Sequence, residues 1–227
     1  MIDRLRRSRR RPGRLRLGGL EPVSRTFGFD RGKPIDRWYI ERFLAARAAD
    51  VRGRVLEVAE STYTQWYGGD DVASSDVLHR TGDGVPEVSV VGDLTTGEGL
   101  PAAAYDCFIC TQTLPFIYDL PAAVRGIRAV LAPGGVALVT LPALSPTSRE
   151  DRRDWGDWWR FTSMSAERLF ADAFGLGAVA VQAHGNVLTA AAFLYGHAAE
   201  ELTEAELAHA DPDYELLVTV RATRSPD

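Results

Sequence analysis

Short apolar runs, separated by segments with helical or turn-like patterns, dominate the order of hydrophobic and polar positions along the chain. The first run, residues 54–59, follows a glycine and has the pattern of a buried parallel strand. Strands that alternate with helices predict βαβ units and a mainly parallel sheet. The last two runs predict a closing antiparallel pair. The runs after the first are residues 72–78, 88–91, 105–111, 136–141, 178–183 and 214–221.

The spacing of apolar positions also predicts helices. Pro34 suits the first turn of an N-terminal helix, and a second helix over residues 121–131 ends before Pro133. A third begins at Ser165, which we expect to cap it. The long segment between the last two strands, which contains alanine-rich residues 190–199 and acidic residues 200–206, predicts a helical insertion. The apolar face of the N-terminal helix comprises Ile35, Trp38, Tyr39, Phe43 and Leu44.

The composition is that of a globular protein. The chain has 227 residues, of which 45% are hydrophobic and 25% charged, which fits one α/β domain. No apolar run approaches the roughly 18 residues needed to cross a bilayer, and no apolar segment of a secretory signal follows the basic start. We therefore expect a cytoplasmic protein without a membrane span.

The charge is distributed unevenly. Residues 1–16 contain eight arginines and one acidic residue, which leaves 18 basic and 30 acidic residues and a formal charge of −12 on the remainder. We interpret residues 1–26 as a flexible basic arm and residues 27–227 as a single domain. Because the remainder has no basic stretch to support it, we do not expect nucleic-acid binding, although an arm of this kind leaves nucleic acid or an anionic membrane as an alternative.

The two cysteines, Cys107 and Cys110, lie three positions apart on a predicted strand. Such positions point to opposite faces of a sheet, so we expect core thiols rather than a redox pair. The few scattered histidines do not complete a metal-ligand spacing, so no metal site is predicted.

Polar residues stand at the ends of the first four predicted strands. Glu57 lies two residues before the end of the first strand, and Asp76 lies 19 positions later at the end of the second. Asp93 follows the third strand, while Thr111 and Gln112 follow the fourth. A carboxylate about 20 positions past the first strand can accept hydrogen bonds from both hydroxyls of a ribose, so the pattern predicts a nucleoside-containing cofactor. Each carboxylate alone also fits a turn residue, and Glu57 fits a helix cap.

Five segments resemble, in order, the motifs of class I S-adenosylmethionine-dependent methyltransferases over roughly residues 35–222. They are Val55-Leu56-Glu57-Val58, Ser75-Asp76-Val77, Gly92-Asp93-Leu94, residues 105–112 and residues 131–139. The resemblance implies a Rossmann-like, doubly wound α/β sheet of order 3-2-1-4-5-7-6, with strand 7 antiparallel, and S-adenosylmethionine as the cofactor. The cofactor-binding residues that it implies are Glu57, Ala59, Glu60, Ser61, Asp76, Val77, Asp93, Leu94, Thr111 and Gln112.

Residues 29–41 and 155–162 are similar to a bacterial subgroup of type 11 methyltransferases that is often found beside or fused to glycosyltransferases. This similarity implies a saccharide or other small-molecule acceptor, methylated most simply on oxygen, and a role in biosynthesis. The abundance of arginine and alanine beside a single lysine, Lys33, is typical of GC-rich bacterial genomes. The sequence is compatible with a homodimer but does not determine the oligomeric state.

One departure concerns the turn after the first strand. The family usually has Gly-x-Gly-x-Gly there, whereas this chain has Ala59-Glu60-Ser61-Thr62-Tyr63. Glycine allows positive φ and a close approach of the backbone to a cofactor. The alternative hypothesis is therefore a methyltransferase-fold protein that does not methylate, either a cyclase-like catalyst or a biosynthetic scaffold.

Methyl transfer from a sulfonium needs alignment of the reactants and at most one general base. Asp157 and His184 are the predicted catalytic residues, because their segments follow strands 5 and 6. The structural alternatives are an ion pair between Asp157 and Arg160, and a buried, hydrogen-bonded His184. Aromatic side chains in a binding site can stack on sugar rings, although aromatic residues are also common in the hydrophobic core. The predicted acceptor-binding residues are Trp38, Tyr39, Trp155, Trp158 and Arg160.

Overall fold

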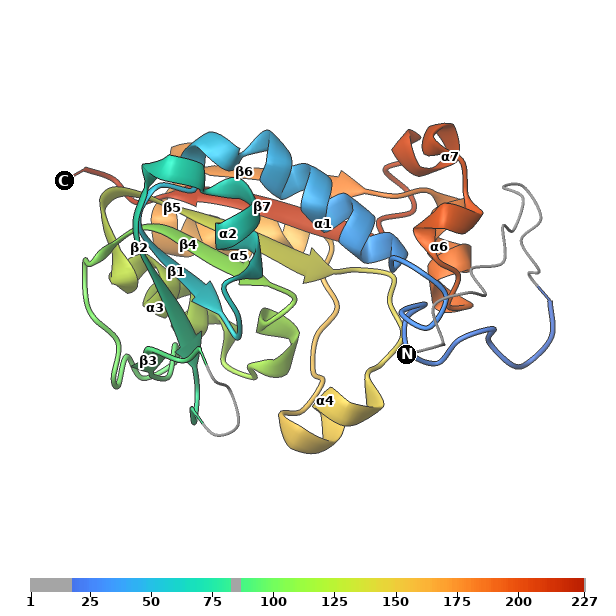
Figure 1. Ribbon diagram of the computed structural model, residues 1–227, viewed down its shortest axis with the longest axis horizontal. Helices are drawn as coiled ribbons and strands as arrows, with labels where there is room; N and C mark the ends of the chain where they lie inside the picture. Colours follow the sequence, from blue (N-terminus) through green and yellow to red (C-terminus); the bar gives the residue numbers. More distant parts are fainter. Residues whose placement is uncertain (1–17, 83–86, 227) are drawn as a thin grey trace, which may run out of the picture.

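A seven-stranded sheet forms the centre of the protein (Figure 1). The structure is a computed structural model and describes residues 18–82 and 87–226. The strand order is β3-β2-β1-β4-β5-β7-β6, and β7 alone runs antiparallel to its neighbours. The predicted topology is therefore confirmed. The strands are β1 (Gly53–Val58), β2 (Val72–His79), β3 (Val90–Val91), β4 (Tyr105–Thr111), β5 (Leu131–Pro142), β6 (Val179–His184) and β7 (Leu217–Thr223).

Helices cover both faces of the sheet, because each face presents its own apolar cluster. One cluster joins Phe108 of the sheet to Ile127 and Phe170, and the other joins Ile109 to Leu44 and Phe193. Helices α3 and α5 thus pack on one face, and α1 and α6 on the other. The helices are α1 (Ile35–Ala46), α2 (Thr62–Tyr67), α3 (Leu120–Val130), α4 (Arg149–Asp154), α5 (Ser163–Phe174), α6 (Val187–Leu194) and α7 (Glu204–Ala208).

The cap predicted for helix α5 was wrong, and local hydrogen bonds give the reason. Helix α5 is capped by Thr162: its hydroxyl accepts from the Ser165 amide, and the Ser165 hydroxyl accepts from the Thr162 amide. Ser165 is thus the second half of a capping box rather than the cap. In the predicted helical insertion, helix α6 begins at Val187, before the alanine-rich stretch, because the Asn186 side chain accepts from the amides of Leu188 and Thr189.

Strand β2 extends to His79, one residue past the apolar run of residues 72–78, so Asp76, which was expected at the strand end, lies three residues before it. The continuation is stabilised because Val77 and Leu78 are buried, and because Leu78 and His79 pair with strand β3. His79 therefore stands at the carboxyl end of β2, and Asp76 lies inside the strand.

The cysteines occupy strand β4 as predicted. Both are free thiols with no exposed surface, and each belongs to a different apolar cluster. Burial raises the pKa of the Cys110 thiol to about 12. These thiols are core residues on opposite faces of the sheet.

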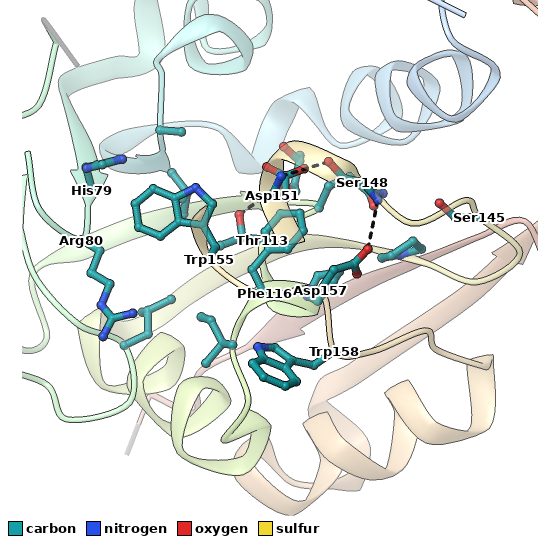
Figure 2. A pocket seen from close by; sticks show the side chains of 18 of the residues that line it. His79, Arg80, Thr113, Phe116, Ser145, Ser148, Asp151, Trp155, Asp157 and Trp158 are labelled. Atoms are coloured by element: carbon teal, nitrogen blue, oxygen red, sulfur yellow. Dashed lines mark hydrogen bonds between the residues drawn. The ribbon is translucent and has the colours of Figure 1, made fainter. Parts of the chain in front are cut away.

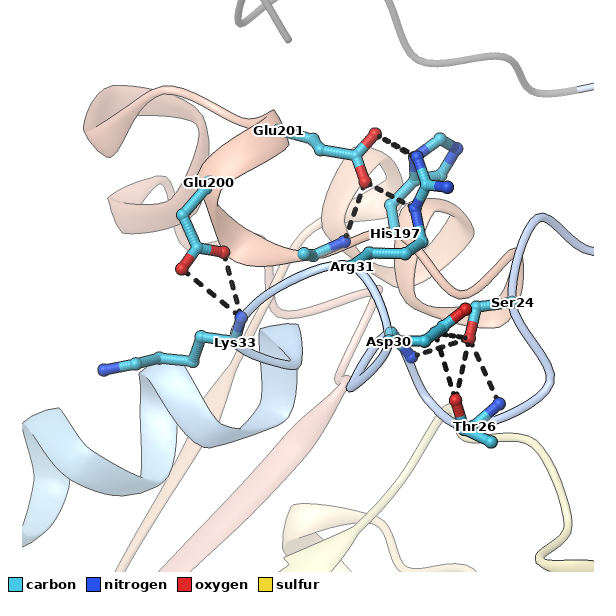
Figure 3. A network of polar contacts seen from close by, with 10 residues as sticks. Ser24, Thr26, Asp30, Arg31, Lys33, His197, Glu200 and Glu201 are labelled. Atoms are coloured by element: carbon cyan, nitrogen blue, oxygen red, sulfur yellow. Dashed lines mark hydrogen bonds and ion pairs between the residues drawn. The ribbon is translucent and has the colours of Figure 1, made fainter. Parts of the chain in front are cut away.

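The segment before α1 packs against the far end of the chain. The Arg31 guanidinium donates two hydrogen bonds to the Glu201 carboxylate, at 2.7 and 2.9 Å, and His197 contacts the same carboxylate at 2.9 Å (Figure 3). The Val23 amide donates to the Tyr195 carbonyl, so this packing already includes residues assigned from sequence to the basic arm. Residues 1–17 of that arm lie outside the described part of the chain. Among the described residues, no helix combines the length and apolarity that crossing a membrane requires.

Candidate functional site

A cavity of about 740 Å³ lies at the carboxyl edge of the sheet, within the size range of small-molecule sites. Strands β1, β2, β4 and β5 end at it, and the connection of residues 143–162 and the segment before α1 complete its wall (Figure 2). Ten of the predicted site residues line the cavity. These are Ala59, Glu60, Asp93, Leu94, Thr111, Gln112, Trp155, Asp157, Trp158 and Arg160.

Two non-glycine residues at strand ends adopt left-handed backbone conformations beside the cavity. Ala59 has φ 72° directly after β1, and Gln112 has φ 52° directly after β4. The Ala59 amide donates to the Leu78 carbonyl at 2.9 Å, and the Gln112 amide donates to the Thr140 carbonyl at 3.0 Å. Neighbouring strands therefore hold both conformations, which are unfavourable for residues with a Cβ. Ala59 has the positive φ that glycine would supply in the family motif.

Asp93 follows β3 and also lines the cavity. The hydroxyl and the amide of Thr95 both donate to its Oδ1 atom, at 2.6 and 2.7 Å. These hydrogen bonds, with the nearby charge of Arg80, outweigh burial and hold the pKa of Asp93 below its usual value. The group is thus a fixed carboxylate.

Glu57 and Ser61 do not line the cavity. The Glu57 carboxylate accepts hydrogen bonds from the amides of Tyr63 and Thr64 and from the Thr64 hydroxyl, at 2.7 to 3.1 Å. It therefore caps the start of α2, which was the structural alternative. Burial raises its pKa. The Ser61 hydroxyl donates to Glu87 at 2.6 Å.

Asp76 and Val77 also lie off the cavity. Ser89 donates to Asp76 Oδ1 at 2.8 Å, and the Tyr105 hydroxyl donates to Oδ2 at 3.2 Å. The Val77 side chain is buried in the core. Since β2 runs on to His79, the residues that this strand contributes to the cavity are Leu78, His79 and the following Arg80.

The connection of residues 143–162 carries four of the residues predicted on the acceptor side, Trp155, Asp157, Trp158 and Arg160. The Asp157 carboxylate receives hydrogen bonds from Arg160 at 2.6 and 3.0 Å and from the Ser148 amide at 3.1 Å. Burial alone would raise its pKa, but these donors and the charge of Arg160 lower it. Trp158 lies edge-on to Tyr118, with ring centroids 5.3 Å apart, and both residues are more than half exposed.

His184, Trp38 and Tyr39 are not part of the cavity lining. The His184 ring contacts the Thr219 hydroxyl at 2.9 Å and packs against Tyr39, and burial lowers the pKa of the imidazole to about 4. The Tyr39 hydroxyl donates to the Leu207 carbonyl, and Trp38 stacks with Arg42. Helix α1 does reach the cavity, but through Asp36 and Arg37. Asp36 and Trp38 are two positions apart, as are Arg37 and Tyr39. Two positions correspond to a rotation of about 200° around the helix, so the members of each pair lie on different faces of α1.

Several lining residues were missed by the sequence analysis. Phe27 and Phe29 come from a segment without regular structure, and no periodic pattern marks them. Asp151 lies on α4, in a stretch too polar to suggest a wall. His79 had a usable signal, because the apolar pair Val77-Leu78 before it indicates that the strand continues.

Comparison with known proteins is consistent with this architecture. Residues 50–139 match the family described as a methyltransferase domain, and no curated protein matches the sequence. An Archaeoglobus fulgidus S-adenosylmethionine-dependent methyltransferase is 11% identical, with a TM-score of 0.53 over 83% of this chain and 94% of that one. The Bacillus subtilis protein YcgJ is 14% identical, with a TM-score of 0.51 over 83% and 99%. The (4+2)-cyclase SpnF is 17% identical, with a TM-score of 0.51 over 83% and 82%.

The domain match and the shared fold confirm the resemblance to the class I S-adenosylmethionine-dependent methyltransferases. The cofactor that this resemblance implies is S-adenosylmethionine, on which the Archaeoglobus fulgidus protein depends. The arrangement at Ala59 fits this group, since the alanine has the left-handed conformation that leaves the turn after β1 open toward the cavity.

Proposed function

We propose that the protein transfers a methyl group from S-adenosylmethionine to an oxygen atom of a small-molecule or saccharide acceptor. The observation that carries the proposal is the division of one cavity into two parts. Strand ends with strained turns form the first part, and exposed aromatic rings on the connection of residues 143–162 form the second. A bacterial biosynthetic role fits the subgroup that the sequence resembles.

The charges around the cavity suit a cationic cofactor. The lining contains more carboxylates than guanidinium groups, and a sulfonium is attracted to such surroundings. Each of the three arginines, moreover, has a carboxylate partner within 4 Å: Asp36, Asp93 or Asp157. The acidic side chains are Asp36, Glu60, Asp93, Asp151 and Asp157, and the arginines are Arg37, Arg80 and Arg160.

The aromatic part suits an acceptor with a ring. Trp158 and Tyr118 present exposed ring surface beside the cavity, and aromatic faces contribute binding free energy through stacking. When bound, S-adenosylmethionine supplies an activated methyl group. The residues of this chain then have to orient the acceptor hydroxyl and remove its proton.

Asp151 is our candidate for the proton acceptor. Its amide donates to the Ser148 hydroxyl at 3.2 Å, and its carboxylate has no recorded partner within residues 18–82 and 87–226. The Asp157 carboxylate, in contrast, is occupied by Arg160 and the Ser148 amide. We therefore assign Asp157 to holding the connection in place rather than to proton transfer.

Two measurements test the function. Calorimetric titration with S-adenosylhomocysteine, the demethylated product, should show one saturable site per chain. Incubation with S-adenosylmethionine carrying a labelled methyl group should then label hydroxylated acceptors in a panel of saccharides and small aglycones. Failure of wild-type protein to bind either cofactor form would refute the proposal.

A non-methylating catalyst or scaffold is the second candidate, because the cyclase SpnF shares the fold and because Ala59 replaces a motif glycine. Saturable cofactor binding without labelling of any acceptor in the panel would favour this candidate.

A further inference from the structure

We propose that His79 recognises the ribose of the cofactor by donating a hydrogen bond to a hydroxyl oxygen, and that Asp76 takes no part in this recognition. The inference rests on the proposed function, since S-adenosylmethionine supplies the ribose. It assigns the ribose contact to an imidazole N–H group, where the sequence pattern predicted a carboxylate.

The position of His79 follows from strand pairing. Val58 of β1 is level with Leu78 of β2, and the Ala59 amide donates to the Leu78 carbonyl. His79 is therefore level with the turn after β1, at the edge where doubly wound sheets bind nucleosides. Its side chain is partly exposed and lines the cavity (Figure 2).

The hydrogen bonds of the imidazole define its tautomer. Nδ1 accepts from the Gly82 amide at 2.9 Å and from the Thr81 amide at 3.3 Å. An amide can donate only to an unprotonated ring nitrogen, so the proton of the neutral ring resides on Nε2. Nε2 has no recorded partner within the described residues, and its N–H group is free to donate to a ligand.

The Asp76 carboxylate is already engaged. Ser89 and Tyr105 donate to its two oxygens, and the Arg54 guanidinium lies 3.8 Å from Oδ2. Turning this carboxylate toward the cavity would break both hydrogen bonds, and its place inside β2 keeps it three residues from the strand end.

Trp155 packs against the imidazole ring of His79. The two rings meet edge to face, with centroids 5.6 Å apart and an interplanar angle of 85°, and both line the cavity. Trp155 belongs to the connection of residues 143–162, so this contact joins the acceptor wall to the end of β2.

Donation by Nε2 has a consequence that a carboxylate would not share. A carboxylate accepts from both hydroxyls of a ribose, whereas a single N–H group donates to one oxygen. Removal of one particular hydroxyl should therefore weaken binding much more than removal of the other.

The test is calorimetric titration of the full chain with S-adenosylhomocysteine and with its 2′-deoxy and 3′-deoxy analogues. Wild-type protein should bind one analogue about tenfold more weakly than the parent compound, as expected for the loss of one hydrogen bond. His79→Ala should bind the parent about tenfold more weakly and should not discriminate against that analogue. His79→Gln, whose amide can also donate, should recover part of the discrimination.

Asp76→Asn is the matched control, because it nearly preserves shape while removing a carboxylate. It should leave the discrimination unchanged, and melting curves would establish that each variant is folded. The inference is overturned if His79→Ala keeps the wild-type discrimination or if Asp76→Asn loses it. Wild-type protein that binds no S-adenosylhomocysteine would refute the proposed function itself, a result distinct from either of these.

Discussion

The two parts of the cavity are built in different ways. The cofactor part consists of short turns on strand ends, held by backbone hydrogen bonds between adjacent strands such as those of Ala59 and Gln112. The acceptor part consists of a 20-residue connection between β5 and α5, and Figure 1 shows its helix α4 standing away from the sheet. Its fixed points are a few side-chain contacts, above all the pair of Asp157 and Arg160.

This difference separates a geometry that the sheet imposes from one that local side chains determine. Strand pairing fixes the turns after β1, β2 and β4 wherever this sheet forms, whereas a long connection adopts the shape that its own side chains stabilise. We therefore expect substitutions in the connection to change acceptor use and turnover, and substitutions at strand ends to change cofactor affinity.

The largest expected effect is on turnover, in the acceptor part. Asp151→Asn should lower kcat by about 10²- to 10⁴-fold while the Kd of S-adenosylhomocysteine stays unchanged, because a general base acts only in the transition state. Single-turnover kinetics with an acceptor found by labelling would measure it.

Asp157→Asn is the comparison variant for that experiment. It should mainly raise the acceptor KM and leave the shape of the pH–rate profile unchanged. If instead Asp157→Asn abolishes turnover and Asp151→Asn does not, the proton acceptor is Asp157, as the sequence analysis predicted.

The second effect concerns His184, which lies outside both parts. Its folded-state pKa of about 4 is below the unfolded value of 6.5, so the unfolded chain binds the proton more readily between these pH values. Wild-type protein should therefore lose up to about 3 kcal/mol of unfolding free energy as the pH falls from 6.5 to 4. Denaturant titrations of His184→Gln should show a smaller loss over this range. If His184→Gln instead lowers turnover strongly at neutral pH, His184 takes part in catalysis, as the sequence analysis predicted.

A smaller effect is expected from the aromatic wall. Trp158→Ala should raise the acceptor KM by about tenfold at most, since a stacking contact contributes roughly 0.5 to 1.5 kcal/mol. Cofactor affinity should not change. Trp155→Ala is the informative partner, because Trp155 also contacts His79. Its loss should weaken cofactor binding as well through this contact, and equal cofactor affinity of the two variants would show that the contact of Trp155 with His79 does not support cofactor binding.

The smallest effect is expected at Ala59. Glycine is free to adopt φ 72°, which compensates for its greater freedom in the unfolded chain. Ala59→Gly should therefore leave the free energy of unfolding within about 0.5 kcal/mol of wild type, with cofactor affinity equal or higher. The control Ala73→Gly, at an exposed position in β2, should lose roughly 0.5 to 1 kcal/mol. A loss at Ala59 as large as at Ala73 would show that the turn is not strained.

The sequence by itself determined the sheet and the approximate location of the site. Apolar runs predicted the strands because buried parallel strands need two apolar faces, and the motif order gave the topology. Thr111, Gln112 and Asp93 were identified as site residues because each lies at or just after the end of a strand, and strand ends meet at one edge.

Only the tertiary structure decided which side chains face the cavity. Asp76 and Glu57 are carboxylates at plausible positions, yet hydrogen bonds from Tyr105 and from the amide of Thr64 hold them elsewhere. Phe29 and Asp151 reach the cavity through segments whose paths are set by distant partners and by a long connection. The direction of a side chain depends on such contacts, and local sequence patterns do not encode them.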